Sequence, residues 1–420
     1  MPTMKDEAPN SRIQWESLEE SHNWIDSITL PEIRNIDETW RDLVQEIQRK
    51  ARKNLGNREE KLNNDKFKNV PTLNEWKSHF EKLFSAKTPT LQLPELAPVE
   101  NLELKIEEED VEFSLKQMKT GKEAGVDDIP IDFWKLFPRA IKFLTDFFIA
   151  ILESRKIPTQ WKRAFIMPRY KGIGETNDCA MYRPIQHLSH TRKLFEKIFE
   201  RKLRSLGIGT TENQCGHKKN RGVKVAHRGL RSLLASSSPI HMAFLDIKNA
   251  NDSVTPKCVW WALRKHSVPE NYIDFLKLML VDQSAQVFSR DQLSDSFPIE
   301  TGFPQGSPLS NFLLVLVVDA ITRDFQRPFP WTILYSDDIL LADETREGLE
   351  FQCTNWARRL AEFGLKFNEK KGKYLNTEDG TGEALNLRIE NCTIDRAKSV
   401  VYLGKIFDDT LPTSKKDRRK

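Results

Sequence analysis

The sequence predicts an α+β fold in which helical segments alternate with short strands that end in carboxylates. Apolar residues recur at helical spacing from Trp40 to Leu55, as in a helix with one buried face. The run 242–246 (Met-Ala-Phe-Leu-Asp) is a short apolar strand that ends in an acid. The run 333–341 (Ile-Leu-Tyr-Ser-Asp-Asp-Ile-Leu-Leu) places two acids between apolar segments, as in a buried β-hairpin. With 420 residues, the chain is long enough for two or three packed units.

The composition argues against several classes of protein. The chain is 39% hydrophobic and 30% charged, and it has no apolar run near the length of about eighteen residues that indicates a membrane helix. Its N-terminus lacks the apolar core of a signal peptide. The five cysteines are far apart and show no Cys-x-x-Cys spacing, which predicts free thiols and no zinc site. We therefore expect a cytoplasmic or nuclear protein that has no membrane partner.

The N-terminal part of the chain is predicted to be a helical arm followed by a linker. Residues 1–70 are polar and charged apart from the helix that ends before Gly56. A second helix begins at Thr72, because Thr72-x-x-Glu75 has the spacing of a capping box. Three prolines after this helix favour an extended linker, which completes a segment at 71–100.

The middle of the chain carries most of the excess positive charge. Residues 101–150 are predicted to be helical apart from a loop with Gly and Lys at 119–130. Between residues 155 and 231 there are nineteen Lys or Arg against five Asp or Glu, a net charge of +14 in a chain with a formal charge of +4. Such a block suits a phosphate-rich partner, although a solvated helical surface explains part of it. Residues 407–420 form a short basic tail.

The paired acids Asp337 and Asp338 are the strongest candidates for a functional site. Burial of two adjacent like charges is costly unless a cation lies beside them, and Mg²⁺ is the usual partner of such hard oxygen ligands. An exposed Asp-Asp turn is the alternative, but both flanks are strongly apolar. Asp246, taken alone, is better explained as an ordinary strand end or helix cap than as a functional acid. The hairpin is therefore predicted to be half of a metal site.

In their order along the chain, five segments resemble the conserved blocks of reverse transcriptases. They are a strand ending in Asp246, a Pro-Gln-Gly loop before a helix, a Tyr-x-Asp-Asp hairpin, a Gly-Leu-Lys-x-Asn turn and a Tyr-Leu-Gly strand. Other segments resemble the non-LTR (LINE-type) retrotransposon enzymes in particular: 182–185 (Tyr-Arg-Pro-Ile), 193–197 (Lys-Leu-Phe-Glu-Lys), 214–216 (Gln-Cys-Gly), 306–310 (Gly-Ser-Pro-Leu-Ser) and the 119–130 loop. Group II intron and retron enzymes share the palm blocks and are the alternative at the level of the family.

The resemblance covers roughly residues 72–406 and implies a right-hand polymerase fold. Within a reverse transcriptase domain at 151–406, the fingers are expected at 151–240 and the palm at 241–406. The chain ends soon after its Tyr-Leu-Gly strand, so a truncated or absent thumb is expected. The arm at 1–70 is too short for the endonuclease that usually precedes such a polymerase.

The resemblance also implies roles for individual residues. The expected catalytic acids are Asp246, Asp337 and Asp338, which would bind two Mg²⁺ ions, or Mn²⁺ in their place, together with the carbonyl of Ile247. The expected nucleotide-binding residues are Lys171, Arg183, Asn251, Gln305, Gly306 and Lys371. The expected nucleic-acid contacts are Lys193, Lys218, Lys219, Arg221 and Lys224. The implied partners are an RNA template, a DNA primer and dNTPs, and the oligomeric state is left open.

Two departures from the family pattern bear on activity. The family commonly has an aromatic residue five positions after the first acid, where it excludes the ribose 2′-hydroxyl, and this chain has Asn251. Asp128 stands where Gly is usual in the 119–130 loop. We expect an RNA-directed DNA polymerase with weakened exclusion of ribonucleotides. The alternative is a degenerate, inactive retroelement remnant that still binds RNA or DNA.

Overall fold

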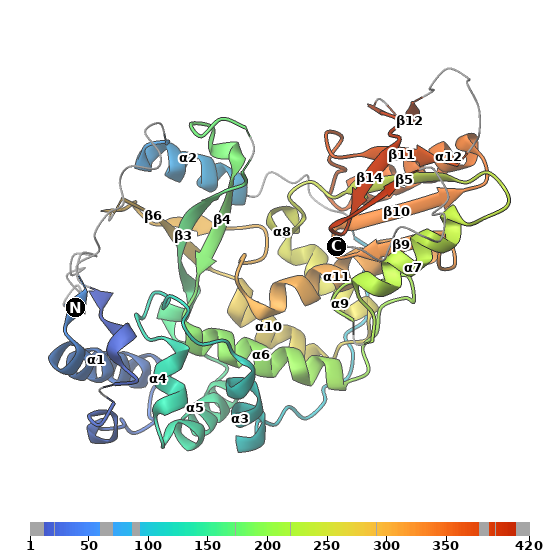
Figure 1. Ribbon diagram of the computed structural model, residues 1–420. Coiled ribbons are helices and arrows are strands. Elements are labelled where there is room, and N and C mark those ends of the chain that lie inside the picture. Colours follow the sequence, from blue (N-terminus) through green and yellow to red (C-terminus); the bar gives the residue numbers. More distant parts are fainter. Residues whose placement is uncertain are drawn as a thin grey trace. The chain divides into compact units, whose positions relative to one another are not determined.

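The computed structural model describes residues 12–20, 22–58, 70–85, 93–172, 174–218, 220–290, 292–377, 386–390 and 392–408 (Figure 1). The chain forms two compact units, each built from separate stretches of sequence. The first unit comprises 1–87, 98–207 and 268–310, and the second comprises 88–97, 208–267 and 311–420. The combination of helices with mainly antiparallel strands confirms the predicted α+β class. The domain bounds expected from the sequence stay predictions.

The first unit contains a five-stranded sheet surrounded by helices. The strand order is β4-β3-β6-β7, and β8 also pairs with β6. β3 is antiparallel to β4 and parallel to β6. The strands of this sheet are β3 (Arg163–Tyr170), β4 (Tyr182–His187), β6 (Gln283–Ser289), β7 (Gln292–Leu293) and β8 (Phe297–Ile299). A separate pair is formed by β1 (Arg12–Ile13) and β2 (Asn57–Arg58).

Two helices of the first unit match the sequence expectations of a helix that ends before Gly56 and a helix that begins at Thr72. The α-helices are α1 (Ile36–Leu55), α2 (Leu73–Phe84), α3 (Glu108–Gln117), α4 (Ile131–Leu136), α5 (Ala140–Ser154), α6 (His190–Ser205) and α10 (Glu270–Leu280). The 3-10 helices are η1 (Trp15–Ser17), η2 (Ile25–Ser27), η3 (Thr159–Lys162) and η4 (Cys179–Met181). The predicted capping box is confirmed: the Thr72 N–H donates to Glu75 Oε2 at 2.7 Å, and the Glu75 N–H donates to Thr72 Oγ1 at 3.3 Å.

Part of the basic block serves the interior of the first unit. Arg192, on α6, is fully buried and pairs with Glu196 at 2.7 Å. Its guanidinium also donates to the side chain of Gln283 at 2.7 Å and to the carbonyl of Met279 at 3.1 Å. These bonds tie α6 to β6 and α10. Truncating Arg192 would leave buried partners unsatisfied, so this cation is structural.

The second unit is built on a four-stranded antiparallel sheet with the order β11-β5-β10-β9. Its strands are β5 (His241–Asp246), β9 (Thr332–Tyr335), β10 (Asp338–Asp343) and β11 (Lys373–Asn376). Two further hairpins are formed by β12 (Leu387–Ile389) with β13 (Cys392–Ile394) and by β14 (Ser399–Tyr402) with β15 (Lys405–Asp408). The helices are α7 (Val223–Leu234), α8 (Ala250–Ser253), α9 (Pro256–Lys265), α12 (Arg346–Glu362), η5 (Arg323–Phe325) and most of α11 (Pro308–Thr322).

Both faces of this sheet are apolar, because each strand alternates two sets of buried side chains. Met242 and Phe244 of β5 pack with α7 and with the β14-β15 hairpin. Helix α12 packs against β5 and β10. A sheet covered on both sides can hold polar groups only at its strand ends, and the candidate acids lie there. Within the described residues, no helix is long and apolar enough to cross a membrane.

Candidate active site

The register of the sheet brings two acids from distant parts of the sequence together. Asp246 is the last residue of β5, and Asp338 is the first residue of β10. The two are direct partners in the antiparallel ladder. Asp337 lies in the adjoining turn, and its carbonyl accepts a hydrogen bond from the Ile247 N–H at 3.1 Å. The backbone therefore holds the three expected catalytic acids at one end of the sheet.

The turn that carries Asp337 is a two-residue hairpin loop. Tyr335 and Asp338 pair across it, which leaves Ser336 and Asp337 in the loop. Ser336 has a φ of +60°, a left-handed conformation that costs a non-glycine residue about 1–2 kcal/mol. A positive φ at the first loop residue suits the right-handed twist of the two strands. The turn is thus tight and strained, and it directs two consecutive acids to the end of the sheet.

The environment of the acids raises their affinity for protons. Burial raises the pKa of Asp337, and the negative charge of Asp246 adds to that effect. Burial also raises the pKa of Asp338 to about 6, with further contributions from Asp337 and Asp246. The ammonium of Lys371 opposes both shifts. Groups with raised pKa values that crowd together are stabilised by any nearby cation.

Lys371 is the cation that the structure places at these acids. Its Nζ lies 3.0 Å from Oδ1 and 2.9 Å from Oδ2 of Asp246. The Asn368 side chain donates to Asp246 Oδ2 at 3.3 Å, and the Asn368 N–H donates to the Asp246 carbonyl at 2.7 Å. Asn368 is the last residue of the predicted Gly-Leu-Lys-x-Asn turn, and Lys371 lies between that turn and β11. In the described part of the chain, no group of three or more His, Cys, Asp or Glu side chains is placed to hold a metal ion.

The chemistry of the donor set nevertheless fits a divalent cation. Three carboxylates lie at one sheet end, and burial together with the negative charge of neighbouring acids raises the pKa values of Asp337 and Asp338. Hard oxygen donors of this kind are what Mg²⁺ prefers. The Lys371 ammonium neutralises only part of that charge. Asp246, Asp337 and Asp338 are therefore suitable residues for such an ion.

Asn251 lies on α8, five residues after Asp246. Its side-chain Oδ1 is buried and has no hydrogen-bond partner among the described residues. A buried acceptor without a donor costs stability, so the position favours a group that can donate a hydrogen bond. An aromatic ring at this position would have no acceptor that needs a hydrogen-bond donor.

Four of the expected nucleotide-binding residues lie in the first unit. Arg183 is exposed on β4, while the Lys171 ammonium donates to the carbonyl of Ala180 at 2.7 Å. The Gln186 N–H donates to the carbonyl of Gln305 at 2.9 Å, so the Pro-Gln-Gly loop packs against β4. Gly306 is required in this loop, because a Cβ there would lie 2.6 Å from the Gln186 carbonyl oxygen.

Arg169 is a candidate that the sequence interpretation did not single out. It is exposed on β3 and is the direct cross-strand partner of Arg183. Neither guanidinium forms an ion pair with a described residue. Like charges directly opposite each other destabilise a hairpin unless an anion lies between them. The basic residues interspersed in the segment 161–171 are a sequence signal for Arg169, but its pairing with Arg183 needed the register.

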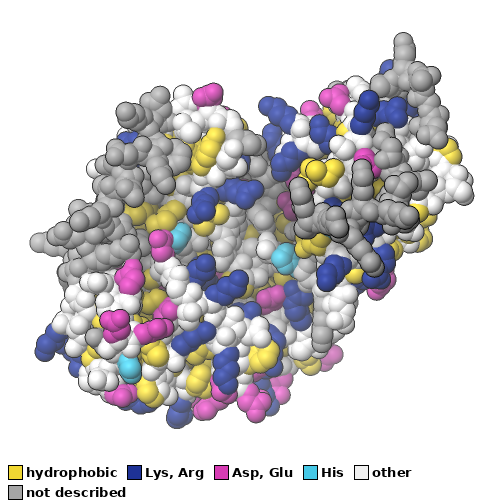
Figure 2. Space-filling model, in the orientation of Figure 1, with side chains coloured by type: hydrophobic (Ala, Val, Ile, Leu, Met, Phe, Trp, Pro, Cys, Tyr) yellow, Lys and Arg dark blue, Asp and Glu magenta, His cyan; other side chains and the backbone are white. Residues whose placement is uncertain are grey.

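The residues expected to contact nucleic acid differ in whether their charged groups are already bonded or buried within the chain. Lys218 donates to the carbonyls of Thr210 and Thr211 at 2.9 and 3.0 Å, and Arg221 pairs with Glu212. Lys193 is largely buried, which lowers the pKa of its ammonium. Lys224 is exposed, and Lys219 lies outside the described residues. On the face drawn in Figure 2, Lys and Arg side chains are interspersed with Asp and Glu.

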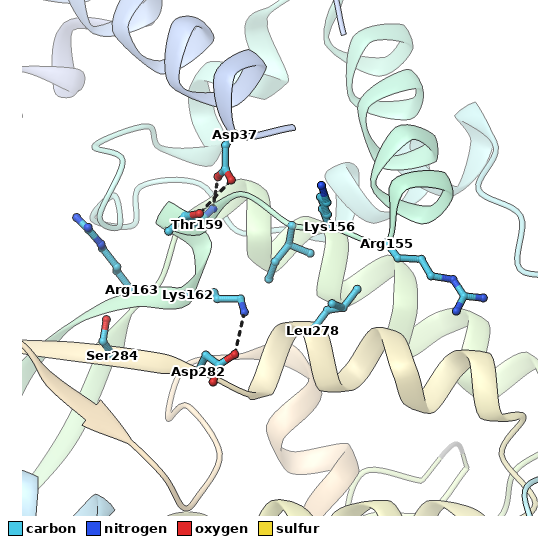
Figure 3. A pocket seen from close by; sticks show the side chains of 10 residues that line it. Asp37, Arg155, Lys156, Thr159, Lys162, Arg163, Leu278, Asp282 and Ser284 are labelled. Atoms are coloured by element: carbon cyan, nitrogen blue, oxygen red, sulfur yellow. Dashed lines mark hydrogen bonds and ion pairs between the residues drawn. The ribbon is translucent and has the colours of Figure 1, made fainter. Parts of the chain in front are cut away.

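A basic pocket of about 490 Å³ lies in the first unit between the end of α5 and the end of α10 (Figure 3). The two acids that line this pocket already have partners in the same unit. Asp37 accepts hydrogen bonds from the N–H of Thr159 at 2.5 Å and from its hydroxyl at 3.0 Å, and Asp282 pairs with Lys162 at 3.6 Å. Three further cations line the pocket and form no ion pair with a described residue: Arg155, Lys156 and Arg163.

Comparison with known proteins identifies the family. The model of the family "Reverse transcriptase (RNA-dependent DNA polymerase)" matches residues 171–407. The chain is 25% identical over 356 residues to the probable RNA-directed DNA polymerase from transposon BS of Drosophila melanogaster, covering 79% of this chain and 38% of that protein. It is 27% identical to the corresponding protein of transposon X-element of the same organism, covering 71% of this chain and 35% of that protein.

Another relative is the Pol polyprotein from the type-1 retrotransposable element R2 of Nasonia vitripennis, which is 24% identical and covers 59% of this chain and 25% of that protein. The chain thus spans between a quarter and two fifths of the length of these relatives. The resemblance noted in the sequence is confirmed. The chain belongs to the reverse transcriptase family, among the enzymes of non-LTR retrotransposons.

Proposed function

We propose that this chain is the polymerase part of an RNA-directed DNA polymerase and adds dNTPs to a primer 3′-hydroxyl on an RNA template. The observation that carries the proposal is the pairing of Asp246 with Asp338 next to Asp337, within a segment that matches the family. Such an enzyme works on its RNA and DNA partners in the cytoplasm, the nucleus or both. Its oligomeric state is outside the proposal.

Members of the family use divalent metal ions, and we propose two Mg²⁺ ions here, with Mn²⁺ as a substitute. Asp246, Asp337, Asp338 and the carbonyl of Ile247 would hold them. When bound, such ions lower the pKa of the attacking hydroxyl and stabilise negative charge on the phosphates. The chain's own acids contribute by their fixed placement, since the β5-β10 ladder sets the separation between Asp246 and Asp338 before any substrate arrives.

Positive groups of the chain are proposed to bind the triphosphate. Arg183 and Arg169 project from neighbouring strands, and two guanidiniums can donate paired hydrogen bonds to phosphate oxygens. Lys171, at the end of the same hairpin, adds a third charge. Gln305 and Gly306 form a narrow backbone surface beside β4 on which a base or sugar can rest. Lys371 would contact the phosphate that leaves.

Asn251 is proposed to weaken the exclusion of ribonucleotides. Its free Oδ1 can accept a hydrogen bond from a ribose hydroxyl, whereas an aromatic ring would block that group. Single-nucleotide incorporation of rNTPs and dNTPs measures the effect. The variant Asn251→Phe should raise the preference for dNTPs about tenfold or more. Equal discrimination in the two proteins would contradict this role.

Template binding is proposed to use exposed cations that form no ion pair within the described part of the chain. These are Arg155, Lys156 and Arg163 around the basic pocket and Lys224 on α7. A smaller contribution to template binding is proposed for Lys218, Arg221 and Lys193, because their charged groups are bonded or buried within the chain. Contacts with phosphates are independent of sequence and weaken with salt.

A degenerate remnant that binds RNA without polymerising is the second candidate. Asp128 favours it, since this residue adopts a φ of +50° in the loop where the family commonly has Gly. Asp tolerates this conformation better than most residues, so the strain is modest.

Primer extension on an RNA template with Mg²⁺ and dNTPs tests the proposal. The purified chain should extend the primer, and Asp337→Asn should abolish extension. If neither protein extends the primer while both bind the template in a salt-dependent way, the remnant is the correct description.

A further inference from the structure

A short segment before α7 covers the outer edge of the strand that carries the catalytic turn. The Cys215 N–H donates to the Leu334 carbonyl at 2.7 Å, and the Leu334 N–H donates to the Asn213 carbonyl at 2.9 Å. Gln214 and Leu334 are thereby paired in parallel. Residues 213–216 thus extend the sheet beyond β9 and continue it to the level of the turn.

The side chain of Gln214 reaches the turn itself. It is 0% exposed, and its Oε1 accepts hydrogen bonds from the Gly216 N–H at 2.8 Å and the Ser336 N–H at 3.1 Å. These two donors fix the orientation of the Gln214 amide, because a flipped amide would place its NH₂ group against two backbone N–H groups. The Nε2 of Gln214 is left buried without a partner among the described residues. This side chain is therefore not optimised for stability alone.

The close approach of Gly216 and the backbone conformation of Ser336 both permit the hydrogen bond to Gln214. A Cβ on Gly216 would lie 2.7 Å from the Ser336 nitrogen and 3.2 Å from the Tyr335 carbonyl carbon, so no other residue fits there. Ser336 holds the left-handed conformation that a serine disfavours. The hydrogen bond from its N–H to Gln214 is made in that conformation. The segment and the strained turn therefore support each other.

We propose that residues 213–216 form a clamp on the catalytic turn and that Gln214 is a positioning residue for Asp337. By fixing Ser336, the clamp sets the place of the Asp337 carboxylate beside the pair of Asp246 and Asp338 before a divalent cation binds. A preorganised set of ligands binds a cation more tightly than a mobile one, so loss of the clamp should weaken the site. This inference rests on the proposed function, because it assigns the acids to that cation.

The test compares Gln214→Met with the wild-type chain. Methionine has a similar length but offers no comparable acceptor to the two N–H groups. We expect Mn²⁺ binding to the protein without substrates, followed by electron paramagnetic resonance, to weaken roughly tenfold. In primer extension, kcat should fall by a similar factor, while KM for dNTP should change less than about twofold, since Gln214 acts on the acids. Gln286→Met, which removes a half-buried glutamine bonded to the Ser294 carbonyl in the first unit, is the matched control.

Ser336→Gly in the Gln214→Met background supplies the decisive comparison. Glycine adopts a φ of +60° without strain, so the turn should need less support and most of the Mn²⁺ affinity should return. If Gln214→Met alone does not fold, this double variant carries the test, and its own failure to fold would overturn the clamp. Unchanged Mn²⁺ affinity in a folded Gln214→Met, or an equal loss in Gln286→Met, would overturn it as well.

The two proposals can fail separately. If the wild-type chain binds Mn²⁺ but does not extend primers, and Gln214→Met still weakens binding, the clamp stands and the polymerase function falls. If the wild-type chain extends primers and Gln214→Met changes neither Mn²⁺ binding nor kcat, the function stands and the clamp falls. If the wild-type chain neither binds Mn²⁺ nor extends primers, both are wrong.

Discussion

The two groups of charges that the proposed chemistry requires are held in opposite ways. In the second unit, Asp337 and Asp338 are partly buried at the end of a sheet that is covered on both faces. In the first unit, Arg169 and Arg183 are exposed on a hairpin and form no ion pair with a described residue. Strand pairing fixes the backbone at both places, but only the acids are also partly buried.

Physical chemistry explains the difference. Carboxylates that must share a small cation have to be close together, and their repulsion and burial raise their pKa values. Only a rigid backbone can maintain such an arrangement. A guanidinium stays charged at any ordinary pH and reaches phosphates over several ångströms, so it can remain in water until its ligand arrives. A fixed backbone therefore matters more for the acids than for the guanidiniums.

Asp337→Asn tests what it costs the fold to hold buried acids close together, and it should produce the largest effect on activity. Extension activity should fall by at least about a thousandfold, because one acid of the set is removed. The melting temperature without metal should rise, since the raised pKa of Asp337 means that its charge is unfavourable in the folded state at pH 7. Calorimetry alongside primer extension measures both. A variant with a lower melting temperature would show that the carboxylate contributes to stability.

Asp127, a buried acid outside the site, offers a comparison with the proposed catalytic acids. It is 0% exposed, accepts a hydrogen bond from the Ser189 hydroxyl at 2.5 Å, and burial raises its pKa to about 6. Between about pH 4 and 6, the folded state keeps this proton and the unfolded state releases it. The free energy of unfolding should therefore fall by roughly 3 kcal/mol as the pH rises through that window, and Asp127 should add no further change above it.

Asp127→Asn should remove this contribution to the pH dependence. Urea unfolding at pH 4.5 and at pH 7 measures it as the difference between the wild-type and variant slopes. Identical slopes would mean that the proton on Asp127 is not coupled to folding.

Neutralising the exposed guanidiniums should separate binding from stability. Arg169→Gln and Arg183→Gln should each raise KM for dNTP about tenfold, because each change removes one charge-assisted hydrogen bond to a phosphate. Either change should leave the free energy of unfolding equal or slightly higher, since it relieves a like-charge pair. The control is Lys142→Gln, which removes an exposed cation of α5 that pairs with Asp146. A KM that stays at the wild-type value in both arginine variants would exclude the hairpin as the triphosphate site.

The basic pocket should give the smallest effect. Arg155→Gln with Lys156→Gln should weaken RNA binding severalfold and reduce the slope of log affinity against log salt by about one for each phosphate that is no longer neutralised. Fluorescence anisotropy with a single-stranded RNA at several salt concentrations measures both quantities. The same slope in the variant and in Lys142→Gln would place the RNA elsewhere.

The local structure of the site can be derived from the amino-acid sequence alone. Short continuous apolar runs predicted the strands at 242–246 and 333–341, and two adjacent acids between apolar flanks predicted a hairpin turn. The spacing of Thr72 and Glu75 predicted a helix start that the structure confirms. These features depend on residues a few positions apart, so they can be read from a short window. The order of the motifs along the chain was enough to predict the family.

The meeting of distant residues depends instead on how the whole chain packs. Asp338 lies opposite Asp246, and Arg169 lies opposite Arg183, because each pair of strands settled in one register. A shift by one residue would turn every side chain of a strand to the other face, and the packing of apolar residues excludes that. The hydrogen bond between Gln214 and Ser336 depends on the same register. No local pattern encodes such pairings, since they result from burying the apolar surface of the whole unit at once.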